Sequence, residues 1–415
     1  MMKFEEARAT ILDNISLLGT EEVELLDSLG RVAAEDTVAP FNLPPFDNSA
    51  MDGYAVRAAD CAIGAMLEIH DYVPAGGIAK SALEPGKAIK IMTGAPLPKA
   101  SDVIVPFEDA TEENHAITLN KPVRMGQHIR RAGEDVKSGD TVFTAGTQIR
   151  TAEINILASL GAGFVKVYRR PVVAILATGD ELIEAGQPLA EGKLYNSNSF
   201  MLAAAVREAG GIPLILGIAR DNRESLREKM EAGLEADVLI TAAGVSVGDR
   251  DFVRPMLEEL GVKQVFWKID IKPGKSTAFG MHGRKPVFAL PGNPVSAMIT
   301  FLELVRPAIL KMMGRRQVIQ PLLTAIMQED MRNKSGKTFF ARVRLEAIGG
   351  KLYARSAGHQ DTGFQRTVCM ANGIAMLPAD RNNIKAGEDV AVHFLGGNLN
   401  LAEPVAREEE VASGF

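Results

Sequence analysis

The sequence predicts a multi-domain protein that combines an α/β domain, built on a mostly parallel sheet, with β-rich domains. Between residues 169 and 313, short apolar runs alternate with segments of helical periodicity, which is the pattern of βαβ units. Residues 46–139 and 320–404 instead carry short strand-like runs separated by Gly, Pro and Asp, which is typical of β-rich domains. A chain of 415 residues is long enough for about three domains.

Composition and charge exclude several classes of protein. With 46% hydrophobic and 24% charged residues, the chain is neither disordered nor fibrous. The net charge of −6 provides no basic surface, so we expect no binding to nucleic acid or to anionic membranes. Two distant cysteines, Cys61 and Cys369, exclude a disulfide framework. No signal-peptide pattern and no apolar run of ~18 residues is present, so we expect a cytoplasmic protein.

The N-terminal third is expected to begin with a helix and to continue as a connector and a β-rich domain. Apolar residues at helical spacing predict an amphipathic helix over 5–28. Prolines at 40, 44 and 45 then favour an extended connector. Strands are predicted at MLEIHDYV, AIKIMTG, DVIVPFE and HAITLNK, and a helix over 152–160 that ends at Gly161.

The α/β region carries an ordered series of strands and helices. Its apolar runs are PVVAILATG, IPLILGIA, DVLITAAG, KQVFWKI and PVFALPG, and its helical segments cover about 198–209, 223–235, 251–260 and 293–313. Ligands of such sheets bind beyond the carboxyl ends of the parallel strands. That rule selects four loops, each expected to lie between a strand and a helix: 177–182, 219–222, 242–251 and 290–296.

Two of these loops have the residue types that bind a phosphate. In the loop 242–251, Gly244, Ser246 and Gly248 allow the backbone to approach an anion closely. The alternative is a tight turn in which Asp249 or Asp251 caps the next helix. In the loop 290–296, a simple helix start, with Asn293 as N-cap and Pro294 in the first turn, explains the sequence equally well.

Three lysines form a basic segment after a predicted strand. On an extended chain, Lys268 and Lys272 project to the same side, and Lys275 follows closely. Cations beside anion-binding loops favour an anionic ligand, although a solvated surface is the alternative for any single lysine.

Acidic residues in the same loops suggest a divalent cation. Asp180 and Glu181 follow one predicted strand and Asp221 follows the next. Carboxylates beside phosphates repel them unless a hard cation such as Mg²⁺ lies between. Six scattered histidines lack the spacing of a zinc site. The residues alone therefore predict an α/β domain that binds a phosphorylated ligand with Mg²⁺.

Seven segments, taken together and in order, resemble the MoeA family of molybdopterin molybdenumtransferases, which includes the E domain of gephyrin. They are PPFDNSAMDGYAV (44–56), IMTGAPLP (91–98), IRRAGEDV (129–136), ATGDEL (177–182), GVSVGDRDFV (244–253), KPGKS (272–276) and LPGNPVS (290–296).

The resemblance implies a four-domain subunit that works as a homodimer, in which the β-rich domain reaches toward the partner's site. It also implies transient contacts with other cofactor-biosynthesis proteins and with apo-molybdoenzymes. The implied domains are a three-layer α/β molybdopterin-binding domain (1–19 and 169–319), a β-rich domain (46–139), an elongated connector domain (20–45 and 140–168) and a C-terminal β-barrel (320–404).

The implied activity belongs to molybdenum cofactor biosynthesis. The enzyme inserts molybdenum from molybdate into adenylylated molybdopterin and releases AMP, assisted by Mg²⁺. Matching motif positions imply catalytic roles for Asp52, Thr93, Asp135, Glu181 and Asp221, with Glu181 and Asp135 also as metal ligands. The implied substrate-binding residues are Gly244, Ser246, Gly248, Asp251, Lys268, Lys272, Lys275, Pro291, Asn293 and Pro294.

The sequence departs from the family pattern at a few positions, which leaves alternatives open. Ser276 stands where proline commonly follows KPGK, Ala243 replaces a usual glycine, and the segment 359–368 is altered. A paralogue that prefers tungstate is one alternative. The others are a molybdopterin adenylyltransferase, which the additional β domains and the connector disfavour, and a non-catalytic scaffold.

Overall fold

The chain folds into two compact units. The computed structural model describes residues 1–243, 252–396 and 399, so the predicted ligand residues Gly244, Ser246, Gly248 and Asp251 lie outside the described residues. The first unit comprises Met1–Glu21 and Tyr168–Phe415, and the second comprises Glu22–Val167. The finer division into four domains stays a prediction.

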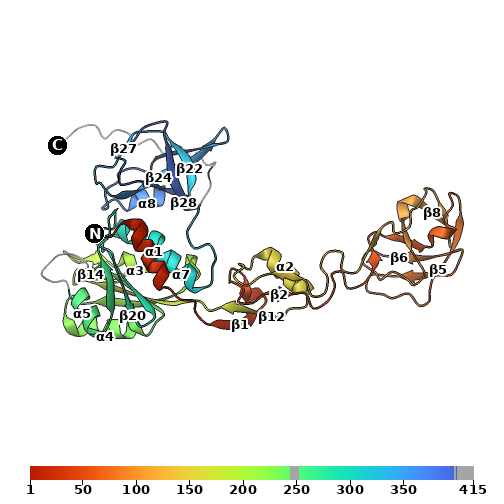
Figure 1. Cartoon of the computed structure of the whole chain (residues 1–415), viewed down its shortest axis with the longest axis horizontal. Helices are drawn as coiled ribbons and strands as arrows, with labels where there is room; N and C mark the ends of the chain where they lie inside the picture. Colours follow the sequence, from red (N-terminus) through yellow and green to blue (C-terminus); the bar gives the residue numbers. More distant parts are fainter. Residues whose placement is uncertain (244–251, 397–398, 400–415) are drawn as a thin grey trace. The chain divides into compact units, whose positions relative to one another are not determined.

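A six-stranded sheet forms the centre of the first unit (Figure 1). Its order is β16-β13-β17-β21-β20-β18, with β16, β13, β17 and β21 parallel and β20 antiparallel to both of its neighbours. The predicted, mostly parallel sheet is thus confirmed, and β20 is an addition that the helix–strand alternation did not predict. The strands are β13 (Val172–Thr178), β16 (Ile212–Ala219), β17 (Val238–Ala242), β18 (Lys263–Trp267), β20 (Ala278–His282) and β21 (Lys285–Leu290).

Helices cover both faces of this sheet, which makes three layers (Figure 1). Alternate residues of a strand point to opposite faces. Val173 therefore joins one apolar core with α1, α3, α6 and α7, whereas Ala174 joins a second core with α4 and α5. The helices are α1 (Phe4–Asn14), α3 (Ser197–Glu208), α4 (Arg223–Leu234), α5 (Val253–Glu259), α6 (Pro294–Thr300) and α7 (Arg306–Met312), the last two joined by a π-helical segment (Phe301–Val305).

The predicted helix over 5–28 is wrong beyond residue 14. Helix α1 ends at Asn14, and Thr20–Glu24 form strand β1, which pairs with β12 (Phe164–Tyr168). The Leu18 amide donates to the Met312 carbonyl at 2.9 Å, and the Gly19 carbonyl accepts from the Arg169 amide at 2.8 Å. Distant segments thus use the backbone groups that a longer helix would need.

A closed barrel of five strands, also in the first unit, confirms the predicted C-terminal β-barrel. Strands β24, β25, β22, β28 and β26 follow one another, and β26 pairs back onto β24. The short strand β19 (Ile271–Lys272) of the α/β region adds to β24, and Phe4 of α1 packs edge-on against Phe340 at 5.0 Å between ring centroids. The barrel elements are β22 (Leu323–Met327), β24 (Thr338–Ile348), β25 (Lys351–Ser356), α8 (Arg366–Met370), β26 (Gly373–Leu377) and β28 (Asp389–Phe394), beside the pair β23 (Met331–Arg332) and β27 (Asn383–Ile384).

The second unit is built on another six-stranded sheet, of order β7-β4-β6-β5-β9-β8. The four strands predicted there are present, and the predicted helix after residue 150 is α2 (Thr151–Ser159), followed by Gly161 at φ +77°. The sheet strands are β4 (Gly53–Val56), β5 (Met66–Val73), β6 (Lys87–Ile91), β7 (Val103–Pro106), β8 (Ala110–Glu113) and β9 (Ala116–Leu119); the two-stranded pairs are β2 (Thr37–Val38) with β11 (Thr141–Phe143) and β3 (Asn48–Ser49) with β10 (Ile129–Arg130).

The helices in the described part of the chain are short. The longest, α3 and α4, have 12 residues each. None of these helices combines the length and the apolar character needed to cross a bilayer. Both cysteines are free thiols.

Candidate active site

A cavity lies where the parallel strands of the first unit end. Because β16, β13, β17 and β21 are adjacent and parallel, the loops that follow them meet at one edge of the sheet. The cavity has a volume of about 420 Å³, within the range of small-molecule sites. Its lining includes Glu181, Asn196, Asn198, Gly292, Pro294 and Gln365.

Glu181 brings an unpaired carboxylate to this cavity. Its backbone carbonyl accepts from the Leu194 amide at 2.9 Å, whereas its side chain has no hydrogen-bond or ion-pair partner among the described residues. The carboxylate packs directly over Gly179, where an added Cβ would lie 2.6 Å from Oε1. Gly179 also has φ +143°, so only glycine fits this close approach without strain.

The loops after β13 and β16 are joined by two aspartates. The Asp221 amide donates to Asp180 Oδ1 at 3.2 Å, and the Asp180 amide donates to Asp221 Oδ2 at 3.4 Å. The predicted proximity of these residues is therefore confirmed. The loop 177–182 follows β13 and precedes α3, as expected, but the chain between them forms a parallel pair that was not predicted, β14 (Leu182–Ile183) and β15 (Leu194–Tyr195). That pair brings Tyr195 to the cavity.

Two asparagines at the start of α3, which the sequence analysis missed, present unsatisfied polar atoms. Asn196 caps the helix, since its Oδ1 accepts from the Ser199 amide at 3.3 Å, and its buried Nδ2 has no partner. Asn198 donates from Nδ2 to the Gly292 carbonyl at 2.7 Å, and its buried Oδ1 has no partner. A buried polar atom without a partner costs about 1–3 kcal/mol, so these atoms favour a polar ligand. The run of Asn and Ser at the N-cap and first turn of the helix was the available signal.

The loop 290–296 starts a helix and lines the cavity. Asn293 is the N-cap of α6, with Oδ1 accepting from the Val295 amide at 3.1 Å, and Pro294 occupies the first turn. The helix-start interpretation is thus confirmed for the Asn293 side chain. Pro294 contacts the cavity, whereas Pro291 is buried in the loop.

The predicted alignment of the lysines is wrong, because their segment is not one extended strand. Lys268 has φ +85°, and its amide donates to the Thr277 carbonyl at 3.0 Å. Lys272 lies in β19, with Nζ 5.0 Å from the centroid of the Phe339 ring of the barrel. These two lysines and the exposed Lys275 are not among the residues that line the cavity in the described part of the chain.

The barrel contributes two residues that sequence reasoning did not identify. Gln365 lines the cavity. Arg342 is fully buried, and it donates from Nε to Thr367 Oγ1 at 2.7 Å and from Nη2 to the carbonyls of His359 and Asp361 at 2.9 and 3.0 Å. Its Nη1 is buried without a partner. No local pattern indicates that a barrel loop reaches the α/β domain.

In the second unit, two predicted residues from different motifs come together. The Thr93 amide and hydroxyl both donate to Asp52 Oδ1, each at 2.7 Å. These bonds, the backbone one first, hold the pKa of Asp52 below its usual value, so it is ionised at neutral pH. Asp135 is exposed, and its amide donates to the Leu43 carbonyl at 3.1 Å. Asp135 and Glu181 belong to different units, so their pairing as metal ligands stays a prediction.

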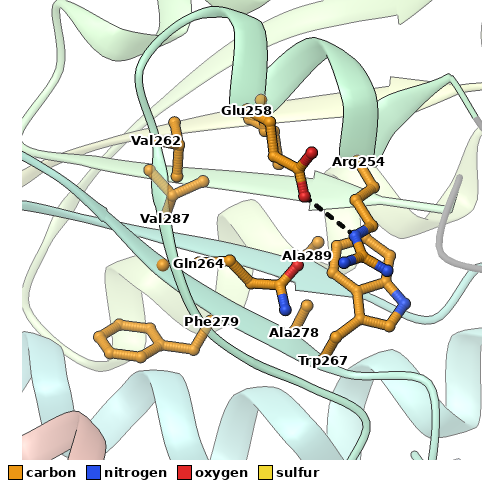
Figure 2. Close-up of a pocket in the computed structure, with 11 residues that line it drawn as sticks. Arg254, Glu258, Val262, Gln264, Trp267, Ala278, Phe279, Val287 and Ala289 are labelled. Atoms are coloured by element: carbon orange, nitrogen blue, oxygen red, sulfur yellow. Dashed lines mark hydrogen bonds and ion pairs between the residues drawn. The ribbon is translucent and has the colours of Figure 1, made fainter.

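A second, smaller cavity lies between α5 and strands β18, β20 and β21 (Figure 2). Its volume of about 20 Å³ suits at most a water molecule or two. The Arg254 guanidinium lies 5.1 Å from the centroid of the Trp267 ring and pairs with Glu258 at 3.1 Å (Figure 2). This cavity is too small for a substrate. Trp267, the chain's single tryptophan, is instead a useful fluorescent reporter beside α5.

Three family models match successive parts of the chain: the MoeA N-terminal region (domain I and II) at residues 2–161, a probable molybdopterin binding domain at 174–311, and the MoeA C-terminal region (domain IV) at 324–395. The molybdopterin molybdenumtransferase of Haemophilus influenzae is 37% identical over 405 residues, which cover 95% of this chain and 100% of that protein. The enzyme of the same name from Bacillus subtilis is 35% identical over 90% of this chain and 89% of that protein.

The crystal structure of a molybdopterin biosynthesis MoeA protein from Pyrococcus horikoshii is similar to the whole chain. Its TM-score is 0.83 at 32% identity, and the match covers 96% of this chain and 100% of that one. The motifs, the three successive domain matches and these full-length similarities agree. The chain belongs to the MoeA family of molybdopterin molybdenumtransferases.

Proposed function

We propose that this chain, as a cytoplasmic homodimer, inserts molybdenum from molybdate into adenylylated molybdopterin and releases AMP with the help of Mg²⁺. Family membership along nearly the whole chain supports the proposal. The observation that carries it is the unpaired Glu181 carboxylate, which lines a cavity of about 420 Å³ together with Asn196 and Asn198, whose side chains each keep one unsatisfied atom. The cavity occupies the edge at which α/β sheets bind ligands.

The reaction makes defined demands on the site. Two dithiolene sulfurs replace two of the four oxide ligands of molybdate, and each oxide leaves as water. Four protons are needed, two from the thiols and two from acids or solvent. Cleavage of the phosphoanhydride consumes one water molecule, so one water is released overall. Molybdenum keeps its oxidation state, and the site must bind anions and move protons.

The acidic residues suit a magnesium ion that the substrate helps to hold. Residues 1–243 and 252–396 contain no group of three His, Cys, Asp or Glu side chains that could hold a metal. Mg²⁺ commonly takes one or two carboxylates and completes its shell with phosphate oxygens and water. Glu181 and Asp135 would supply those carboxylates. Bound there, Mg²⁺ would neutralise negative charge on the phosphoanhydride.

The remaining predicted residues are assigned to substrate binding or to catalysis. The loop that contains Gly244, Ser246, Gly248 and Asp251 is proposed to bind the substrate phosphate. Lys268, Lys272 and Lys275 attract the anionic substrates, and the loop of Pro291, Asn293 and Pro294 brings a helix N-terminus to the cavity. Asp221, held by Asp180, and Asp52, held by Thr93, are proposed as catalytic carboxylates.

The test is a defined reaction. Purified chain, adenylylated molybdopterin and Mg²⁺ are combined with molybdate or tungstate, and AMP release is followed together with the activation of a molybdenum apoenzyme. We expect AMP release that depends on molybdate. Tight ligand binding without AMP release would overturn the proposal, and faster release with tungstate would identify a tungstate-preferring paralogue. Formation of adenylylated molybdopterin from ATP and molybdopterin would favour an adenylyltransferase.

The homodimer is tested separately by sedimentation. We expect a dimer at micromolar concentration. A monomer at that concentration, together with full activity, would overturn the proposed assembly.

A further inference from the structure

Gln365 brings an amide of the barrel into the cavity of the α/β domain. It lies directly before α8 and lines the cavity together with Glu181 and Asn198. Its side chain has no hydrogen-bond partner among the described residues, although its backbone amide donates to the Gly363 carbonyl at 3.2 Å. A polar side chain that lines a ligand cavity and lacks a partner within the protein is available to the ligand.

The loop that carries Gln365 is held in place by buried hydrogen bonds. Gln360 forms a reciprocal pair with the backbone of Arg342, accepting from its amide and donating to its carbonyl, both at 2.9 Å. The Arg342 guanidinium donates hydrogen bonds to the carbonyls of His359 and Asp361, on either side of Gln360, and to the hydroxyl of Thr367. Gln365 lies two positions before Thr367, so this network positions it.

The barrel is in turn held against the α/β domain. Strand β19 pairs in parallel with β24, and Lys337 Nζ contacts Asp270 Oδ1 at 2.7 Å. The buried Glu303 of the π-helical segment contacts His393 Nδ1 of β28 at 2.8 Å. These contacts fix the barrel where Gln365 lines the cavity.

Two other residues that line the cavity keep unsatisfied atoms, which indicate the kind of ligand that Gln365 meets there. Asn196 offers an unpaired N–H donor and Asn198 an unpaired carbonyl acceptor, and Gln365 carries one group of each kind. A phosphate has only acceptors, so it would leave the Asn198 oxygen unsatisfied. A heterocycle whose edge alternates donors and acceptors, such as the aminopyrimidinone ring of a pterin, satisfies all three amides.

We propose that Gln365 is a specificity-determining residue that hydrogen-bonds the donor–acceptor edge of the substrate's pterin ring together with Asn198. The inference rests on the proposed function, because it identifies the part of that substrate that occupies the cavity. The barrel thereby takes part in substrate recognition.

The test uses the full chain and two stable probes, neopterin monophosphate and its deamino analogue, in which hydrogen replaces the 2-amino group. Pterin fluorescence reports binding. We expect the chain to bind the pterin about tenfold more tightly than the deamino analogue, the value of one lost hydrogen bond with its partner left unpaired. Gln365→Ala and Gln365→Met should each reduce this preference to about twofold. Gln328→Ala, an exposed glutamine elsewhere on the barrel, should retain it.

The outcomes separate this inference from the proposed function. A preference for the pterin that persists in both Gln365 variants, or that the parent chain lacks, overturns the inference. Failure of molybdate-dependent AMP release in the parent chain overturns the proposed function, and the ratio of the two probe affinities remains measurable. Thermal unfolding of each variant shows that the barrel stays folded, and the isosteric Gln365→Met replaces the alanine variant if that one does not fold.

Discussion

Asp52 in the second unit and Glu181 in the first both carry a carboxylate, but they differ in the hydrogen-bond partners that the chain gives them. Two hydrogen bonds from Thr93 satisfy Asp52 and lower its pKa. Glu181 receives no such bond within the described residues and lies over Gly179 at a cavity. The chain thus supplies partners for one carboxylate and leaves the other, which is exposed, without a partner among the described residues.

This difference shows how a site can be recognised before its ligand is seen. A protein normally satisfies its buried and half-buried polar groups, as the second unit does around the half-buried Glu153. Around the cavity of the first unit, Asn196 and Asn198 each keep one unsatisfied atom. Unsatisfied groups of this kind should matter more for binding and catalysis than for stability.

The largest effect is expected for Glu181→Gln, because it removes the unpaired charge from the cavity. Molybdate-dependent AMP release should fall about 100-fold, whereas the midpoint of thermal unfolding should stay the same, since the carboxylate has no partner among the described residues. Glu191→Gln in the same region is the control and should retain activity. Full activity of Glu181→Gln with an unchanged Mg²⁺ requirement would remove Glu181 from the site.

Gly179→Ala tests the position of that carboxylate without changing its charge. A Cβ at this residue overlaps the Glu181 side chain and must displace it. We expect AMP release to fall about tenfold, since small displacements of a catalytic group are costly. Gly186→Ala is the control, because Gly186 also has a positive φ, +93°, with nothing within 4 Å of the added Cβ. Equal losses of activity in the two variants would attribute the effect to backbone strain alone.

Thr93→Val removes one of the two hydrogen bonds to Asp52 and should shift the pH profile of AMP release. Loss of the hydroxyl leaves the backbone donor in place, so the pKa of Asp52 rises toward its usual value. The acid limb of the profile of AMP release should therefore shift to higher pH. Asp52 stays ionised at neutral pH, so the loss of about threefold that we expect there comes from a less firmly positioned carboxylate. Thr118→Val on β9 is the control. An acid limb that does not move would mean that Asp52 ionisation does not limit the reaction.

Glu153→Gln is expected to leave the activity unchanged, which is the smallest effect of the series. Glu153 accepts from the Arg150 amide at 2.8 Å and from its guanidinium, and these bonds, the guanidinium first, hold its pKa at about 2. A Gln carbonyl still accepts from the Arg150 amide, but the charge-assisted bonds from the guanidinium are weakened, which should cost about 1 kcal/mol of stability at neutral pH.

The pH dependence of that stability has a defined sign. Because the folded-state pKa lies below the ordinary value of 4.5, the stabilisation is complete above pH 4.5 and is lost as the pH falls toward 2. The difference in urea unfolding between the parent chain and Glu153→Gln should shrink over that range. A difference that stays constant would show that the Glu153 charge does not act through Arg150.

Much of the site followed from local patterns. The apolar runs before residues 178, 219, 242 and 290 predicted four parallel strands, and the rule that ligands bind beyond such strands selected the loops that the structure brings together. The prediction that Asn293 caps a helix was also confirmed. The hydrogen bond from the Val295 amide joins residues two positions apart in sequence, so it could be inferred locally. Periodicity and capping depend on residues a few positions apart, which is why they can be inferred without coordinates.

Other features depend on segments that are distant in sequence. Strand β1 forms because β12 pairs with it. The chain turns at Lys268, where the backbone amide donates a hydrogen bond to the Thr277 carbonyl. Likewise, Gln365 enters the cavity because Arg342 holds its loop and β24 pairs with β19.

The amino-acid order therefore specified the sheet, its ligand-binding edge and the chemical groups that edge carries, since each depends on local spacing. Hydrogen bonds and packing between residues far apart along the chain decide which of those groups remain unsatisfied. The same long-range interactions bring a barrel loop to the cavity. Those interactions exist only once the folded chain brings the partners together.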